Sequence, residues 1–160
     1  MTAPHSFTGG CHCGAVRYEC TSRPLAMLKC HCRDCQQMSG GPYTPVVYMP
    51  AKAFRITKGT LRHYPTPSET GGENLRGFCA DCGSRLTGGE SERGIGITAS
   101  SLDDPSWFKP KMDLWTCDAQ PWDVLDPKLQ KFEKQSDAGR ADRSDAGRAD
   151  GVAHLRGSDS

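Results

Sequence analysis

Hydrophobic and polar side chains alternate with a period of two along several short stretches of the chain. This spacing places one row of side chains on each face of an extended segment, which is typical of a half-buried β-strand. The strands predicted in this way are residues 15–19, 44–49, 53–57, 60–64 and 95–99. No stretch keeps the period of a long helix, and the pattern accommodates at most one helical turn at 34–39, ended by Gly40. The sequence therefore predicts a mostly β-fold of irregular antiparallel sheets.

The pattern changes abruptly at residue 136. From there the segment SDAGRAD occurs twice, and only Val152 and Leu155 are sizeable apolar side chains. Such a segment cannot bury enough surface to offset the entropy of ordering it. We therefore expect a single domain over residues 1–135 and a disordered low-complexity tail over residues 136–160.

Composition narrows the class of partner. The 160 residues carry a net charge of only +1, without the clustered excess of Lys and Arg that nucleic-acid binding requires. No apolar run is long enough to span a bilayer, so neither nucleic acid nor membrane is an expected partner. Residues 1–10 lack the basic and apolar regions of a secretory signal, which makes the cytoplasm the expected location. The oligomeric state stays open.

Seven of the nine cysteines carry the main chemical signal, because they fall into three tight clusters. The clusters are Cys11-x-Cys13, Cys30-x-Cys32-x-x-Cys35 and Cys79-x-x-Cys82. Spacings of one or two residues let a tight turn direct several thiolates to one point, whereas cysteines this close bridge poorly to each other. In a reducing cytoplasm the pattern favours metal over disulfides. We expect Zn²⁺, with two ions per chain.

Seven thiolates divide naturally into four and three. Four thiolates close a tetrahedral zinc site, and three leave one position open for a reacting ligand. The turn Cys79 to Gly83 is typical of a zinc knuckle, and pairing it with Cys11 and Cys13 would form a structural Cys₄ site. The loop that holds the middle cluster would then supply the open site. An alternative joins Cys32 and Cys35 to the knuckle, and spacing does not decide between the two.

Residues around the middle cluster leave several roles open. His31 is a fourth ligand, a proton carrier or a solvent-facing residue, and a residue between two ligands usually points away from the metal. Arg33 and Asp34 either anchor a substrate or form a salt bridge within the loop. The two remaining cysteines, Cys20 and Cys117, are expected to pack as small apolar residues.

Several segments together resemble one known family. They are GGCHCGAVRYEC, KCHCRDCQQMSGGP, GFCADCGSRL, SLDDP and the tryptophans Trp115 and Trp122. The chain resembles the glutathione-dependent formaldehyde-activating enzymes and the related centromere protein V, over about residues 7–132. This resemblance implies a fold of the zinc-binding Mss4-like type.

The resemblance also implies a division of the metal ligands. It places a structural zinc on Cys11, Cys13, Cys79 and Cys82, and a catalytic zinc on Cys30, Cys32 and Cys35. The implied activity is that of a carbon-sulfur lyase that acts on thiol adducts of small aldehydes, similar to S-hydroxymethylglutathione. The expected partner is thus a small thiol or its aldehyde adduct. The alternative is a non-catalytic zinc-binding module or partner-binding domain, in which His31 or Cys20 would complete the second site.

Overall fold

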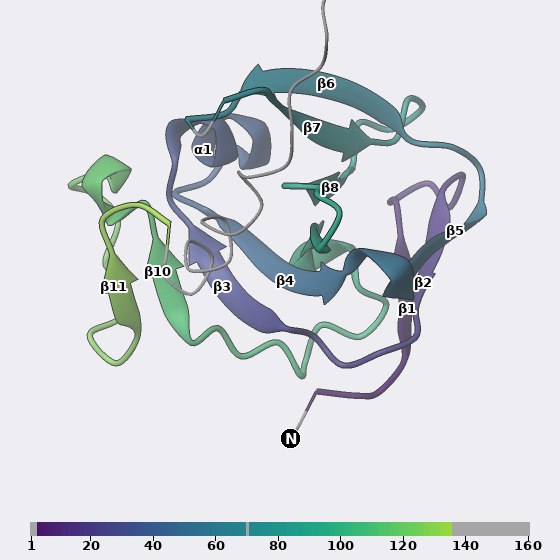
Figure 1. Cartoon of the computed structure of the whole chain (residues 1–160), viewed down its shortest axis with the longest axis horizontal. Helices are drawn as coiled ribbons and strands as arrows, with labels where there is room; N and C mark the ends of the chain where they lie inside the picture. The colour runs from purple at the N-terminus through teal and green to yellow at the C-terminus, as the bar shows by residue number, and fades with distance from the viewer. Residues whose placement is uncertain (1–2, 70, 136–160) are drawn as a thin grey trace, which may run out of the picture.

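The computed structural model describes residues 3–69 and 71–135, which form two β-sheets and one α-helix (Figure 1). The smaller sheet has three antiparallel strands in the order β1-β2-β5. Its strands are β1 (Phe7–Gly10), β2 (Arg17–Cys20) and β5 (Phe54–Lys58). The first cysteine pair lies in the turn between β1 and β2, so this sheet positions Cys11 and Cys13 directly.

The larger sheet has eight strands and holds the other two cysteine clusters at the ends of its strands. In spatial order the strands are β11 (Gln130–Phe132), β10 (Met112–Leu114), β3 (Ala26–Cys30), β4 (Thr44–Pro50), β9 (Gly94–Thr98), β8 (Arg85–Gly88), β7 (Glu73–Phe78) and β6 (Arg62–Pro67). Strand β10 pairs in parallel with both β3 and β11, whereas the remaining pairs are antiparallel. The larger sheet is therefore mixed.

The helix α1 (Arg33–Ser39) follows β3 after a two-residue connection. It begins at Cys32, whose sulfur accepts a hydrogen bond from the backbone N–H of Cys35 at 3.4 Å. It ends at Gly40, which takes a left-handed conformation with φ of 70° that costs glycine little. The helical turn predicted before Gly40 is confirmed, and it also includes Arg33. Three short 3₁₀ turns complete the regular structure: η1 (Ala51–Ala53), η2 (Ala99–Ser101) and η3 (Thr116–Asp118).

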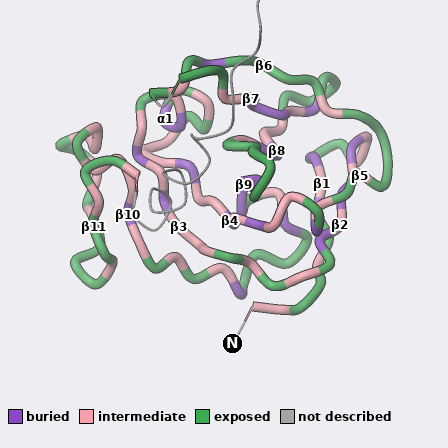
Figure 2. The backbone as a smooth tube through the Cα atoms, in the orientation of Figure 1, coloured by how far each residue is buried: buried purple, intermediate pink, exposed green. Residues whose placement is uncertain are grey.

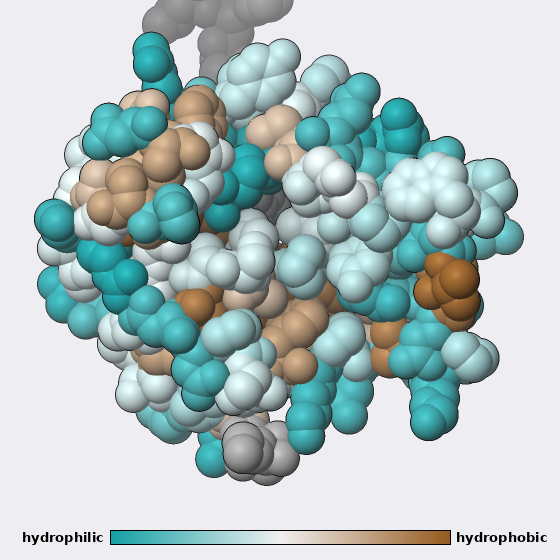
Figure 3. All heavy atoms as spheres, turned by 180° about the vertical axis from the view of Figure 1, so that it is seen from behind, coloured by the Kyte–Doolittle hydropathy of each residue, from teal (hydrophilic) through white to brown (hydrophobic). Residues whose placement is uncertain are grey.

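The hydrophobic core lies between the two sheets. Val16 and Tyr18 from the β2 region pack in one cluster with Val47, Leu86 and Ile97 of the larger sheet. All five residues of β9 are buried, and Figure 2 shows buried positions gathered on the inner strands. On the face shown in Figure 3, hydrophobic side chains occur in small groups among hydrophilic ones. Burial of apolar surface thus holds the small sheet against the large one.

The mostly β-fold predicted from the period-two pattern is confirmed. The five predicted strands correspond to β2, β5, β6, β9 and β4, with ends displaced by up to a few residues. Six further strands were not predicted from the period-two pattern: β1, β3, β7, β8, β10 and β11. Most of these are short, rich in glycine or interrupted by charged residues, so pairing with neighbours and not local sequence makes them strands.

The predicted disordered tail at 136–160 lies outside the described residues. Within the part of the chain that the structure does describe, no helix is both long and apolar enough to cross a membrane.

The close approach of β1 to the turn η2 generates a stability prediction. A Cβ on Gly9 would lie 2.4 Å from the carbonyl oxygen of Ser101, which belongs to the backbone and cannot move aside alone. We expect Gly9→Ala to lower the free energy of unfolding by about 1–3 kcal/mol through overpacking. Urea unfolding at fixed zinc concentration measures this change. Gly41→Ala is the matched control, since a Cβ there meets only Ser39 at 3.8 Å. Equal effects of the two substitutions would contradict the close packing.

Candidate metal centre

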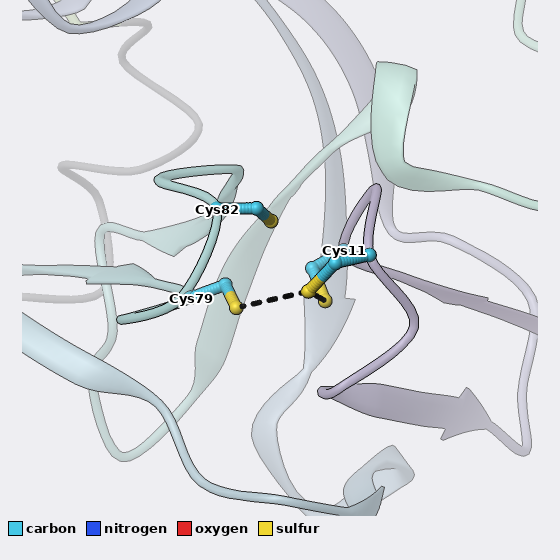
Figure 4. Close-up of side chains that lie close together, drawn as sticks. Cys11, Cys79 and Cys82 are labelled. Carbon is cyan, nitrogen blue, oxygen red and sulfur yellow. Dashed lines mark hydrogen bonds between the residues drawn. The ribbon is translucent and has the colours of Figure 1, made fainter.

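The first cysteine group joins the two sheets. Cys11 and Cys13 come from the turn after β1, and Cys79 and Cys82 come from the turn between β7 and β8. The four sulfur atoms lie within 4.8 Å of one another. Figure 4 shows Cys79 and Cys82 extending toward Cys11 from the opposite side. We refer to these four residues as the four-cysteine group.

Local backbone geometry directs these sulfurs inward. The backbone N–H of Val16 donates to the Cys11 sulfur at 3.1 Å, and the turn closes through the Cys11 N–H to the Val16 carbonyl at 3.0 Å. On the other side Gly83 adopts a φ of 74°, and its N–H bonds the Cys79 carbonyl at 2.9 Å. This is the knuckle geometry predicted from Cys79 to Gly83, and its glycine is needed because side chains are strained at such φ values.

The second group consists of Cys30, Cys32 and Cys35, whose sulfurs also lie within 4.8 Å of one another. We refer to it as the three-cysteine group. The prediction that a loop holds these residues is wrong. Cys30 ends β3, Cys32 caps α1, and Cys35 lies within the first turn of the helix. The groups found in the structure match the division into four and three, and Cys32 and Cys35 do not join the knuckle. The assignment of the metal ligands remains a prediction.

The sulfur spacing fits a tetrahedral metal with thiolate ligands. Zinc-sulfur bonds of about 2.3 Å at tetrahedral angles place the sulfurs about 3.8 Å apart. The Cys11 and Cys13 sulfurs are 3.5 Å apart, and those of Cys13 and Cys79 are 3.8 Å apart. Both groups consist entirely of thiols, the donors that zinc shares with other soft metals. The residues present therefore fit zinc at each group.

Arg76 of β7 compensates charge at the three-cysteine group. Its side chain is buried, and each guanidinium nitrogen has a partner. Nη1 lies 3.7 Å from the Cys35 sulfur, Nη2 lies 3.3 Å from Oδ2 of Asp34, and Nε lies 3.3 Å from Oγ1 of Thr66. Arg76 was not predicted from the sequence, because nothing local marks an arginine in a strand as the neighbour of Cys35, 41 residues earlier.

The thiols of the three-cysteine group have widely separated pKa values. Hydrogen bonds from Cys30 and Cys32, together with the charge of Arg76, lower the pKa of Cys35 to about 2. Cys30 keeps its proton and donates it in hydrogen bonds to the neighbouring sulfurs. Cys32 and Cys35 therefore raise the pKa of Cys30. The Cys30 thiol lowers the pKa of Cys32, but Cys35 and burial outweigh it and the pKa rises to about 11. Without metal, this group is thus one thiolate and two thiols at neutral pH.

The thiols of the four-cysteine group also differ in their pKa values. Ser84 lowers the pKa of Cys82 to about 5, through its hydroxyl and its backbone N–H. The backbone N–H of Ala15 favours the Cys13 thiolate, but Cys11 and Cys82 outweigh it and raise the pKa of Cys13 to about 12. Each group therefore holds a thiolate ready for a cation and protons that a cation must displace.

His31 is fully buried behind the three-cysteine group, and the solvent-facing role is wrong. Its Nε2 lies 3.0 Å from Oδ1 of Asp113, and its Nδ1 lies 3.1 Å from Oδ2 of Asp123. Lys29 and Lys131 also approach Asp113, at 3.2 and 3.5 Å. The imidazole therefore points away from the thiols and ties the chain after β10 to the cysteine-bearing segment.

The other predicted residues have mixed outcomes. Arg33 donates a hydrogen bond to Gln36, and Asp34 forms its ion pair with Arg76 of β7. The salt bridge expected within the loop is therefore wrong. Cys20 is buried in the core as predicted, whereas Cys117 is exposed, and the prediction that it packs is wrong. Trp122 is also mostly exposed, at 65 %.

Comparisons with known proteins agree with this arrangement. The family model of the glutathione-dependent formaldehyde-activating enzyme matches residues 6–118, which is well over half of the chain. A crystal structure of a Rhodobacter sphaeroides protein superposes with a TM-score of 0.51 at 19 % identity, covering 78 % of this chain and 98 % of that one. The second likeness concerns the fold alone. The chain belongs to the family of glutathione-dependent formaldehyde-activating enzymes.

The raised pKa values predict pH-dependent zinc binding at the three-cysteine group. Cys30 and Cys32 hold protons at neutral pH that zinc must displace. Because those protons bind more readily as pH falls, the zinc affinity of this group should fall about 100-fold per pH unit on acidification. Competition with a zinc chelator measures the affinity, and calorimetry in buffers of different ionisation enthalpy counts the protons. The signal of Cys32→Ala, subtracted from that of wild type, isolates this group. An affinity that stays constant with pH would contradict the protonation pattern.

The buried carboxylate of Asp113 generates a second prediction. Its pKa is lowered although burial opposes this, because His31 and Lys29 favour the charged form. We expect Asp113→Ala to cost about 3–5 kcal/mol of unfolding free energy, because it leaves the buried Lys29 without its carboxylate and Nε2 of the buried His31 without its partner. Chemical denaturation measures the loss. Glu90→Ala, at an exposed acid, is the control and should change stability by less than about 0.5 kcal/mol. A comparable loss in both variants would refute the network.

Proposed function

We propose that this protein is a zinc-dependent enzyme of the carbon-sulfur lyase type that acts on thiol adducts of small aldehydes, similar to S-hydroxymethylglutathione. Zinc at the four-cysteine group would be structural, and zinc at the three-cysteine group would be catalytic. Membership of a family that includes enzymes supports an enzymatic role. Glutathione and formaldehyde, which the family's name specifies, are the first substrates to test.

One observation carries the proposal: within the described residues, the three-cysteine group has no fourth ligand. Among residues 3–69 and 71–135, no additional His, Cys, Asp or Glu side chain joins these sulfurs. A tetrahedral metal held by three thiolates keeps one position for an exchangeable ligand. The four-cysteine group, by contrast, offers no such position.

Two side chains could have closed the second site, and neither lies there. His31 faces Asp113 and Asp123 with its two ring nitrogens. Cys20 is buried in the same core cluster as Tyr18, and Phe54 of the smaller sheet packs against this cluster. Either residue as a ligand would favour a non-catalytic zinc module. Their positions support the enzyme over that alternative.

The proposed reaction makes or breaks one bond. In the forward direction the sulfur of the thiol bonds to the aldehyde carbon, and the proton that the thiol loses ends on the former carbonyl oxygen. The reverse reaction returns that proton to the sulfur and restores the aldehyde. Bound zinc would supply one open position, which would either favour the thiolate form of the substrate or polarise a carbonyl oxygen.

The chain's own residues set the charge around this position. Three thiolates with one divalent cation are net anionic, and Asp34 adds a further negative charge. Arg76 contacts both Cys35 and Asp34 and offsets part of this charge. This compensation lowers the cost of bringing another thiolate to the same point. A small thiol in a cytoplasmic setting is the proposed partner.

Zinc content and turnover in a single variant test the proposal. We expect Cys32→Ala to keep its fold and the zinc of the four-cysteine group, and to lose both the second zinc and turnover of hydroxymethyl-thiol adducts. The reason is that two thiolates hold zinc much more weakly than three. Elemental analysis counts the metal, and proton magnetic resonance follows release of the aldehyde.

Cys117→Ala is the matched control, because Cys117 is exposed and lies outside both groups. It should retain both metals and full turnover. Complete unfolding of Cys32→Ala would show that the three-cysteine group is structural. Unchanged turnover in that variant would show that the group is not the active site.

A further inference from the structure

Arg85 of β8 is a half-buried arginine whose side chain has no hydrogen-bond partner among the residues that the structure describes. Its Nε and Nη1 atoms are inaccessible to solvent and form no hydrogen bond. The side chain also makes no ion pair with any residue that the structure describes. Buried polar groups in folded proteins are almost always paired, and an unpaired guanidinium is especially costly. The chain therefore keeps Arg85 at a cost to stability.

The neighbouring arginine shows what a partnered guanidinium looks like in the same place. Arg76 and Arg85 lie on adjacent strands, and both approach Gly88. A Cβ on Gly88 would lie 3.4 Å from Nη1 of Arg76 and 4.0 Å from Nη2 of Arg85. Arg76 has partners for all three nitrogens: Cys35 of the three-cysteine group, Asp34 next to it in sequence, and Thr66 of β6. Arg85 shares the location without sharing those partners.

Arg85 is close enough to the three-cysteine group for their charges to interact. Burial and the positive charge of Arg76 lower the pKa of Arg85, while Cys35, Asp34 and Cys32 act in the opposite direction. A substrate sulfur held at the open position of this group would thus lie in the neighbourhood of an unpaired guanidinium.

We infer that Arg85 binds a carboxylate on the thiol substrate, so that the enzyme selects thiols that carry a carboxylate over neutral ones. This inference rests on the proposed function, since it concerns the thiol that occupies the open position. Arg85 binds and orients the substrate and takes no part in bond making.

Charge favours a carboxylate over a more highly charged anion. Asp34 and Cys35 already engage Arg76. One guanidinium charge is left, and a monoanion balances it. Nη2 of Arg85 is not among the inaccessible atoms, and a carboxylate oxygen can accept a charge-assisted hydrogen bond from it.

Calorimetric titration of the zinc-loaded protein with two thiols tests the inference. Mercaptopropionate carries a carboxylate, and mercaptoethanol is a neutral thiol of similar size. We expect wild type to bind mercaptopropionate at least about 10-fold more tightly, as a charge-assisted hydrogen bond would provide. In Arg85→Gln the ratio of the two Kd values should fall to about one, with the Kd of mercaptoethanol unchanged.

Arg55→Gln is the matched control, because Arg55 is exposed on β5 and pairs with Glu19. It should keep the wild-type ratio. Unfolding in urea gives an independent readout. Arg85→Met should hold or raise the unfolding midpoint, since it removes a half-buried guanidinium without a partner, whereas Arg76→Met should lower it.

The outcomes separate the two proposals. A ratio near one in wild type, or a preference that survives in Arg85→Gln, would overturn the role of Arg85 and leave the lyase proposal standing. If neither thiol binds wild type with zinc at the three-cysteine group, the proposed function fails and the inference fails with it. A loss of the preference in Arg85→Gln alone supports both.

Discussion

Thiolates brought close together repel one another, and the structure around both cysteine groups responds to that repulsion. Each group holds its sulfurs within 4.8 Å. Without a metal, such proximity is tolerable in the three-cysteine group because Cys30 and Cys32 keep their protons and donate hydrogen bonds to the Cys35 thiolate. Backbone N–H groups, Ser84 and Arg76 stabilise the anionic sulfurs further. A divalent cation removes the repulsion at once, which is why metal binding and folding are coupled in sites of this kind.

Strand β7 connects the two groups physically. Arg76 within the strand reaches the three-cysteine group, and Cys79, just beyond its end, belongs to the four-cysteine group. The four-cysteine group in turn fixes the smaller sheet to the larger one. Under the proposed function, zinc at the four-cysteine group would be closed and structural, and zinc at the three-cysteine group would be open and would share the same framework. His31 contacts Asp113 of β10 and Asp123 after it, and so links β10 and the following segment to the same framework.

Much of the fold followed from alternation of polar and apolar residues, as β4 and β9 illustrate. Strands such as β7 did not follow, because a strand with a buried arginine looks polar in sequence and becomes a strand only through its neighbours. The cysteines were accessible to sequence analysis because ligands that share a turn are close in the chain. Arg76, Arg85 and Asp113 were not accessible, since each acts on residues that are distant in sequence.

The sequence by itself determined the number and spacing of the thiols, the mostly β character of the domain and the family to which it belongs. Only the tertiary structure decided that Cys11 and Cys13 meet Cys79 and Cys82, because spacing constrains ligands within a turn and says nothing about which turns converge. It also decided that His31 faces carboxylates and not the thiols, and that Arg85 has no hydrogen-bond partner among residues 3–69 and 71–135. Burial and long-range pairing determine the charge state and availability of a side chain, and these arise only when distant segments pack together.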